Sequence, residues 1–443
     1  MANNMERPIF YSSAYGIDNS GTRLVTQQLQ ELIDETAKVS GKLILETGKY
    51  LTASLFLKSN MEFHFEEGAV LLATTDESQY PILPTRVAGV EMDWYPGVLN
   101  CNGQSHVTVS GNGSINGQGE YWWNKYWGED QKGGMRKEYD AKGLRWACDY
   151  DCMRVRNVVV MDSREVLLRD FTSNQSGFWN VHICYSSHVH VDGIQIMASG
   201  KESPSTDGID IDSCDHVLVE NCVTFCHDDS ICIKSGRDAD GLRVNRPCHD
   251  IEVRNCRILA GFGVTIGSEV SGGVYNITLK NLDYEGTDCG FRIKSSLARR
   301  GYIRDVLVDG LKMHNVKYPF HMNLNWNPAY SYCELPKDYQ GEVADAWKKL
   351  LEQIPDSVPL TEVSDIRIQN VTVWNDDNYK GISRAFHLEG FPTQPINRIH
   401  FENMELQCKE FGVLDYVKDI SMAQVSVSVS ESHNAQNDEY DNR

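Results

Sequence analysis

The segment between Ser205 and Gly236 is the most informative about the fold. It contains first Ser205-Thr206-Asp207-Gly208-Ile209-Asp210-Ile211-Asp212-Ser213 and then His227-Asp228-Asp229-Ser230-Ile231-Cys232-Ile233-Lys234-Ser235. Placed one above the other, the two segments match, with Asp over Asp near the start and Ile over Ile at two alternate positions. The pattern returns in 262–268 and in 289–295. A strand that recurs with its apolar residues in one column is typical of a stacked coil. An antiparallel sandwich would also alternate, but it gives no reason for this shared register.

Strand cores of the form apolar-x-apolar recur along most of the chain. They are Val107–Val109, Val189–Val191, Val217–Val219, Ile251–Val253, Ile277–Leu279, Val306–Val308, Ile366–Ile368 and Ile399–Phe401. Most are followed two residues later by asparagine, namely Asn221, Asn255, Asn281, Asn370 and Asn403. Asparagine tolerates left-handed turns, and identical amides stacked coil on coil can form a hydrogen-bonded ladder. We therefore predict an all-β fold, a single parallel β-helix with long loop insertions.

The repeat defines one domain, residues 1–425. An amphipathic helix over 22–40 is expected to cap the first coil, because a solenoid needs its open end covered. A helical insertion is expected over 325–364, and an aromatic-rich loop beside the site between Trp122 and Cys152. Residues 426–443 turn polar and acidic, and we expect them to form a disordered tail.

Composition restricts the function. The chain has 443 residues and a net charge of -20, which argues against nucleic-acid binding because that requires a basic surface. No apolar run is long enough to cross a bilayer, so no membrane partner is expected. The sequence contains no signal of oligomeric state.

The cysteines and the N-terminus bear on the compartment. Thirteen cysteines is an odd number, and many lie in strand registers where a small apolar side chain fills the interior. No signal peptide precedes the first strand, which favours the cytoplasm. A periplasmic or secreted protein whose leader had been removed would read the same.

Three carboxylates are expected to meet on adjacent coils. Coils of a parallel β-helix lie about 4.8 Å apart, so the register makes Asp207 and Asp229 vertical neighbours with Asp228 beside them. Like charges this close raise at least one pKa and leave a protonated acid beside an ionised base. Glycosidic cleavage needs that division of roles. The alternatives are a calcium site or a solvated acidic turn.

Cationic side chains are expected on the same outer face. Arg292 and Lys294 alternate with inward-pointing apolar residues, and a guanidinium next to an ammonium suits a sugar carboxylate. Lys234 shares this face, and Tyr318 falls in the Asp207 column. Further candidate sugar contacts are Arg237, on a nearby loop, and His182. No metal ligand set and no cofactor are expected.

These motifs resemble glycoside hydrolase family 28, the polygalacturonases. The resemblance rests on Thr206-Asp207-Gly208, Asp228-Asp229, a Gly-x-Gly segment and Arg292-Ile293-Lys294, and it covers about Phe10 to Leu414. It implies a right-handed β-helix and hydrolysis of α-linked galacturonate with inversion. It also implies that Asp228 is the general acid, that Asp207 and Asp229 activate water, and that Arg292, Lys294 and Tyr318 bind the leaving-group sugar.

Two departures refine the expectation. The family's Gly-His-Gly is here Gly261-Phe262-Gly263, and Phe262 offers ring stacking against a sugar instead of a hydrogen bond. Ser205 stands where the family usually has Asn. The segments 234–241 and 266–273 look like those of exo-acting bacterial members.

The leading hypothesis is an exo-acting enzyme that releases terminal galacturonate from pectic oligosaccharides. An enzyme that removes galacturonate linked to rhamnose is the alternative, since relatives acting on that backbone depart at the same histidine. A calcium-dependent pectate lyase and a sugar-binding β-helix that has lost catalysis are less favoured readings.

Overall fold

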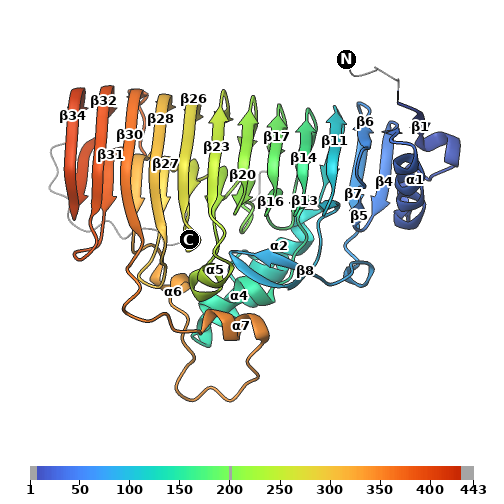
Figure 1. Ribbon diagram of the computed structural model, residues 1–443, viewed down its shortest axis with the longest axis horizontal. Coiled ribbons are helices and arrows are strands. Elements are labelled where there is room, and N and C mark those ends of the chain that lie inside the picture. Colours follow the sequence, from blue (N-terminus) through green and yellow to red (C-terminus); the bar gives the residue numbers. More distant parts are fainter. Residues whose placement is uncertain (1–6, 199–201, 431–443) are drawn as a thin grey trace.

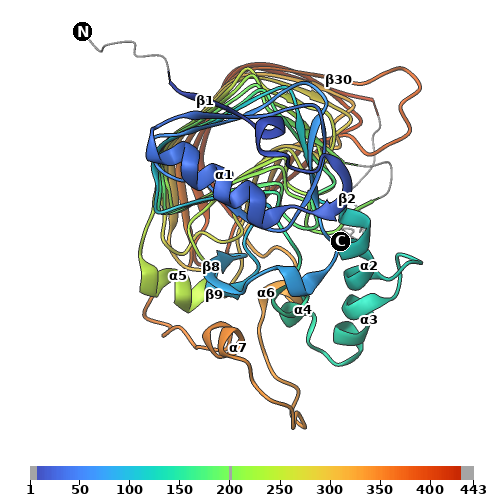
Figure 2. The same cartoon turned by 90° about the vertical axis from the view of Figure 1, so that its right-hand side faces the viewer.

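The computed structural model describes residues 7–198 and 202–430 and contains a long stack of parallel coils (Figure 1). Helix α1 (Thr26–Lys38) lies across the first coil, with Leu29, Leu32 and Ile33 buried against it (Figure 2). The predicted cap is therefore present. It is shorter than 22–40, because residues Ser20–Leu24 form strand β2 instead of the first helical turn.

One face of the stack is a parallel sheet whose strands follow one another in chain order. Its strands are β5 (Leu55–Phe56), β10 (Leu99–Asn102), β13 (Val158–Met161), β16 (Val181–Cys184), β19 (Ile209–Asp212), β22 (Ile231–Lys234), β25 (Val264–Ile266), β27 (Cys289–Lys294), β29 (Tyr318–Asn323), β31 (Arg384–Glu389) and β33 (Glu410–Asp415). This sheet carries the site described below.

The remaining coil strands join in a second sheet. They are β1 (Ile9–Tyr11), β2, β3 (Lys42–Leu45), β4 (Gly48–Thr52), β6 (Glu62–Phe65), β7 (Ala69–Ala73), β11 (Ser105–Gly111), β12 (Ser114–Asn116), β14 (Arg164–Arg169), β15 (Thr172–Asn174), β17 (Ser187–Asp192), β18 (Gln195–Met197), β20 (Asp215–Glu220), β21 (Val223–Phe225), β23 (Cys248–Arg254), β24 (Arg257–Ile258), β26 (Val274–Glu285), β28 (Tyr302–His314), β30 (Glu362–Trp374), β32 (Ile396–Cys408) and β34 (Val417–Val429). Only β8 (Leu83–Val87) and β9 (Val90–Trp94) pair antiparallel among the described strands.

The predicted register is confirmed. Ile209 pairs with Ile231, Ile231 with Val264, and Val264 with Phe291. All four side chains have no exposed surface, so the column forms the interior of the coil stack. Burial of such apolar side chains, about 1.5–3 kcal/mol each, gives every coil the same reason to stack in this register.

The asparagine turns also form as expected. Asn221, Asn255, Asn281, Asn370 and Asn403 all have positive φ. Asn403 donates to the side chain of Asn370 at 2.6 Å, and Asn370 donates to Asp309 at 2.6 Å. The turns therefore hydrogen-bond from coil to coil along the edge of the solenoid.

The helices outside the coils differ from the sequence prediction. The segment between Trp122 and Cys152 is helical, with α2 (Gly119–Trp127), α3 (Gly134–Ala141) and α4 (Arg145–Asp151), and the aromatic residues of α2 and α4 are largely buried, whereas α3 has no buried residue. The later insertion contains α6 (Pro328–Ser331) and α7 (Asp345–Leu350) and ends before β30, at residue 361. The other helices are α5 (Asp238–Val244) and the short 3-10 turns η1 (Ser12–Tyr15) and η2 (Glu77–Gln79).

The C-terminal boundary is also corrected. Strand β34 continues the final coil to Val429, so residues 426–429 are part of the β-helix and not of a tail. Residues 431–443 lie outside the described part. All thirteen cysteines are buried and unpaired, as expected for small apolar fillers. No described helix is long and apolar enough to cross a membrane.

Candidate active site

A cavity of about 540 Å³ lies against the middle of the sheet that begins with β5. Its lining comes from the loops before β19 and β22, from β27 and β29, and from the helices outside the coils. Those helices and the β8–β9 hairpin gather on one side of the solenoid (Figures 1 and 2). The cavity volume falls within the range of about 300–1,000 Å³ that is usual for ligand sites.

Three aspartates meet in this cavity. Asp207 precedes β19, and Asp228 and Asp229 precede β22, so the register places them on neighbouring coils. One carboxylate oxygen from each lies within 4.8 Å of the others. Asp229 is fully buried, Asp207 is nearly so, and Asp228 is half-buried. The structure thus brings the three predicted acids together.

Asp229 is held in its ionised form. Its Oδ2 lies 2.6 Å from Nζ of Lys294, and its Oδ1 lies 3.4 Å from Nη1 of Arg292 and accepts a 2.7 Å hydrogen bond from Thr265. Burial acts to raise the pKa of Asp229, but the Lys294 and Arg292 charges outweigh it and lower that pKa to about 2. Asp229 is therefore the ionised member of the cluster.

The other two acids are shifted in the opposite direction. Burial and the Asp229 charge raise the pKa of Asp228. Burial and the Asp228 charge raise the pKa of Asp207 well above its usual range. One cluster therefore contains both a proton donor and an ionised acceptor, which is the arrangement that general acid–base chemistry needs.

Lys234 is the central cation beneath these acids. Its Nζ lies 3.3 Å from Glu269, 3.6 Å from Asp210 and 3.7 Å from Asp207, and it stacks over the Trp179 ring. Glu269 lines the cavity and was missed at the sequence level, because it lies on a loop outside the repeating columns. Burial would raise the pKa of Glu269, but Lys234 and Arg299 lower it.

Aromatic rings enclose Arg292 and Lys294. The Arg292 guanidinium lies 4.8 Å from the centre of the Phe262 ring, and Nζ of Lys294 lies 4.4 Å from that of Trp326. Phe262, Tyr318 and Trp326 all line the cavity. Trp326 belongs to the later insertion and was not anticipated from the sequence, because the repeat does not constrain that segment.

Arg237 is placed differently from the expectation. It is completely buried and does not line the cavity. Its guanidinium donates to Tyr150 Oη at 2.8 Å, to the Tyr330 carbonyl at 2.7 Å and to Cys333 Sγ at 3.3 Å, and its amide donates to the Gly89 carbonyl. Arg237 therefore joins the β8–β9 hairpin, α4 and α6 into one wall rather than binding a sugar.

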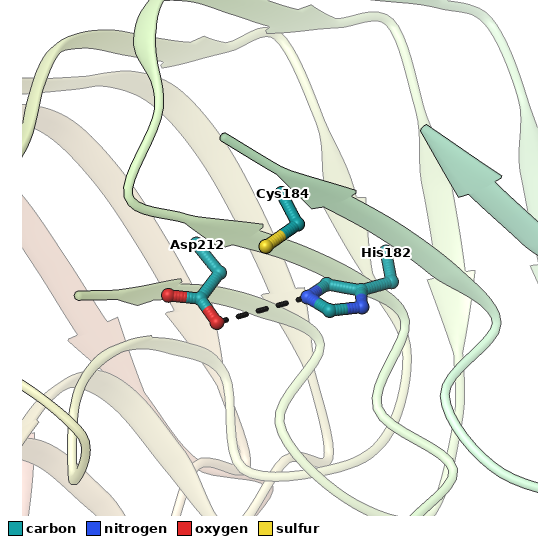
Figure 3. A group of neighbouring side chains, drawn as sticks. All are labelled: His182, Cys184 and Asp212. Atoms are coloured by element: carbon teal, nitrogen blue, oxygen red, sulfur yellow. Dashed lines mark ion pairs between the residues drawn. The ribbon is translucent and has the colours of Figure 1, made fainter. Parts of the chain in front are cut away.

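His182 is also buried and lies outside the lining. Arg156 donates to its Nδ1 at 2.8 Å, which leaves the proton on Nε2, 3.7 Å from Asp212 Oδ2 (Figure 3). Burial lowers the pKa of His182 to about 4, so the ring is neutral. Although Cys184 completes a trio with metal-ligand chemistry, a protonated Nε2 offers no lone pair to a metal. Neither His182 nor Arg237 therefore reaches the cavity.

The family model of the glycosyl hydrolases family 28 matches residues 51–338 of this chain. A probable polygalacturonase of Vitis vinifera is 28% identical over 404 residues, which cover 88% of this chain and 73% of that protein. Among solved structures, an exopolygalacturonase from Thermotoga maritima superposes with a TM-score of 0.79 at 24% identity, covering 95% of this chain and 93% of that one. A family 28 exopolygalacturonase from Yersinia enterocolitica gives a TM-score of 0.72 at 18% identity, with coverages of 97% and 79%.

The two structural likenesses confirm the right-handed parallel β-helix. The family model spans well over half of the chain and includes all three clustered aspartates together with Arg292 and Lys294. The chain belongs to glycosyl hydrolases family 28 and is a glycoside hydrolase of the polygalacturonase type.

Proposed function

We propose that this hydrolase releases terminal α-linked galacturonic acid from pectic oligosaccharides, with inversion at the anomeric carbon. Asp228 donates its proton to the glycosidic oxygen, and Asp229, assisted by Asp207, orients and activates the attacking water. Arg292 and Lys294, together with Tyr318, face the sugar on the leaving-group side of the bond, which stays in the shortened chain. Lys234 balances the charge of the acids beneath the reacting sugar.

The opposed pKa shifts of Asp228 and Asp229 carry this proposal. The two carboxyl groups lie within 4.8 Å of each other, yet one is pushed towards protonation and the other towards ionisation. A general acid of this kind contributes about 10²–10⁴-fold to rate. A sugar-binding protein without catalysis would gain nothing from crowding such acids.

The wall held by Arg237 supports action on chain ends. The β8–β9 hairpin contributes Ala88 to the cavity, α4 contributes Arg145, and the later insertion contributes Tyr330. A long polymer needs a groove open at both ends, whereas a chain terminus fits a groove with one end walled off. The structural neighbours from Thermotoga maritima and Yersinia enterocolitica are both exopolygalacturonases.

Hydrolysis suits these residues better than calcium-dependent elimination. A lyase would need free carboxylates to hold calcium. Here an ammonium and a guanidinium already lie against Asp229, and a further ammonium lies against Asp207. The acids are therefore balanced by the chain's own cations.

A second substrate class is favoured by one observation. Arg292 and Lys294 both contact Asp229, so a uronate on the leaving-group side would compete with that aspartate for them. A neutral rhamnose in that position would leave the contacts intact. Galacturonate linked to rhamnose is therefore the second candidate.

Product analysis tests the proposal. The protein is incubated with oligogalacturonides and, separately, with rhamnogalacturonan oligosaccharides that end in galacturonate, with Asp228→Asn as the inactive control. We expect galacturonate monomer as the first product from at least one set, without ultraviolet-absorbing unsaturated sugars. Unsaturated products, or mixed internal fragments at early times, would refute it.

A further inference from the structure

Arg145 lies in the wall of the cavity and belongs to none of the sequence motifs discussed above. It opens helix α4, lines the cavity, and stacks its guanidinium 5.3 Å from the centre of the Tyr330 ring. Its side chain is 13% exposed, so the guanidinium is largely enclosed while still reaching the cavity. Within the described part of the chain, its Nη1 donates to Asp149 Oδ2, its buried Nε has no hydrogen-bond partner, and no side chain or carbonyl accepts from its Nη2.

Asp149 ties Arg145 to the loop that carries a catalytic acid. Asp149 Oδ2 accepts from Arg145 at 2.6 Å, while Oδ1 accepts from the hydroxyl of Ser205 at 3.4 Å. Ser205 lies two residues before Asp207. Arg154 is also buried and bonds both Ser205 and Asp149. The guanidinium of Arg145 is thus linked to the loop of Asp207 through the side chains of Asp149 and Ser205.

Arg145 and Arg292 lie towards opposite sides of the three acids. The coils follow one another in chain order, and Arg145 connects to the loop before β19. Arg292 lies on β27, beyond the coils that carry Asp229 and Phe262. A glycosidic bond placed over the acids therefore has one guanidinium towards each of the two sugars that it joins.

The other cations of the cavity are less available to the sugar on the Arg145 side of the glycosidic bond. Nζ of Lys234 is shared among three carboxylates, and Lys317 is paired with Asp288 at the opposite side. Arg136 is paired with Asp140 on the outer part of the wall. Arg145 has a free Nη2, a fixed position and no second acidic partner among the described residues.

We propose that Arg145 binds the carboxylate of the terminal sugar, which hydrolysis releases as the monomer. This contact would make the walled end of the cavity selective for a uronic acid. This inference rests on the proposed function. A guanidinium is suited to the task because it stays charged at all relevant pH values and donates charge-assisted hydrogen bonds to carboxylates. The contact is independent of the leaving group, so it applies equally to galacturonate linked to galacturonate or to rhamnose.

Sugar binding measured by calorimetry tests the inference without turnover. Galacturonate and galactose are titrated into the intact protein, because the two sugars differ only at the carboxylate. Wild type should bind galacturonate more tightly. Arg145→Gln should weaken galacturonate binding by about 10–100-fold, as expected for loss of a hydrogen bond to a charged group, and should change galactose binding by less than about threefold.

Two further variants make the result specific. Arg136→Gln removes the neighbouring guanidinium of the same wall and should keep the preference for galacturonate. Arg145→Lys keeps the charge and should restore part of the preference, which a merely structural role would not predict. Equal binding of the two sugars by wild type, or an unchanged preference in Arg145→Gln, would overturn the proposal.

Hydrolysis separates this inference from the proposed function. If wild type releases no galacturonate from galacturonosyl-galacturonate or galacturonosyl-rhamnose, the proposed function fails. If wild type is active but Arg145→Gln keeps its rate on both substrates, only the role of Arg145 fails. A loss of similar size on both substrates supports the role, because the released sugar is the same.

Discussion

Nζ of Lys294 lies 2.6 Å from Oδ2 of Asp229, and both side chains are buried in the floor of the cavity. The ammonium therefore acts on the cluster of three aspartates itself, in addition to the contact with the leaving-group sugar that we propose for it. The sequence suggested only the second role. The ion pair explains why Asp229 stays ionised although burial acts to raise its pKa.

Lys294→Met should move the acidic limb of the pH–rate profile. The pKa of Asp229, now about 2, is lowered chiefly by Lys294 against the effect of burial, so it rises when the ammonium is removed. The base then becomes protonated at a higher pH, and kcat/KM falls earlier as the solution is acidified. Lys312→Met, at an exposed position on β28, is the control. An acidic limb that stays in place would show that Lys294 does not set the ionisation of Asp229.

Asp228→Asn should abolish turnover while leaving substrate binding. The amide cannot donate a proton to the leaving oxygen, so kcat should fall by about 10²–10⁴-fold. Burial and Asp229 raise the pKa of Asp228, so its loss of a proton should also define the alkaline limb in wild type. Rates and calorimetric affinities measured side by side check this. Unchanged hydrolysis would remove Asp228 from its role.

The first product should be the β-anomer of galacturonate. Spacing alone would favour retention, because the carboxylate oxygens lie within 4.8 Å, whereas inverting enzymes usually separate their carboxyl groups by about 6.5–9.5 Å. However, both oxygens of Asp229 are bound by cations, which makes a covalent bond to sugar unfavourable and leaves attack to water. Proton NMR during the first minutes distinguishes the anomers. An initial excess of α-galacturonate would contradict inversion.

Asp210→Asn should stabilise the protein increasingly as pH rises. Asp210 is fully buried, neither of its oxygens has a hydrogen-bond partner in the described structure, and burial raises its pKa well above the usual range. An unfolded aspartate ionises near pH ~3.9, so above that pH the folded state binds more protons and loses stability as pH increases. The amide mimics the protonated form and has no such dependence.

The melting temperature measured from pH 4 to pH 8 tests this. The advantage of Asp210→Asn over wild type should be small at pH 4 and should widen towards neutrality. Asp283→Asn, at an exposed position, controls for the loss of one negative charge. A difference that stays constant with pH would mean that Asp210 is ionised in the folded protein.

The repeat explains which parts could be predicted from the sequence. Alternation and turn asparagines fix the register, and the register fixes which side chains are neighbours, so Asp207, Asp229, Arg292 and Lys294 could be placed together from the sequence alone. Their neighbours on the same strands are buried apolar residues, which leaves only one outer face for the charged side chains.

The insertions explain what could not be predicted. The sequence predicts that Arg237 is a cation on a loop near the site. In the structure, three segments that are distant in sequence cover Arg237 and accept its hydrogen bonds. Arg145, Glu269 and Trp326 lie outside the repeating columns, so no periodicity assigns them to the cavity. Tertiary packing between the insertions determines the positions of these residues. A single sequence contains no repeating pattern from which that packing could be predicted.

The most direct measurement of the central claim is the early degradation of a tetragalacturonide labelled at its reducing end. If the enzyme removes the terminal galacturonate from the unlabelled end, the label should first appear only on the trisaccharide, together with unlabelled galacturonate monomer. Labelled monosaccharide or disaccharide at the same early times would mean that chains are cut internally or from the other end, and would contradict the account.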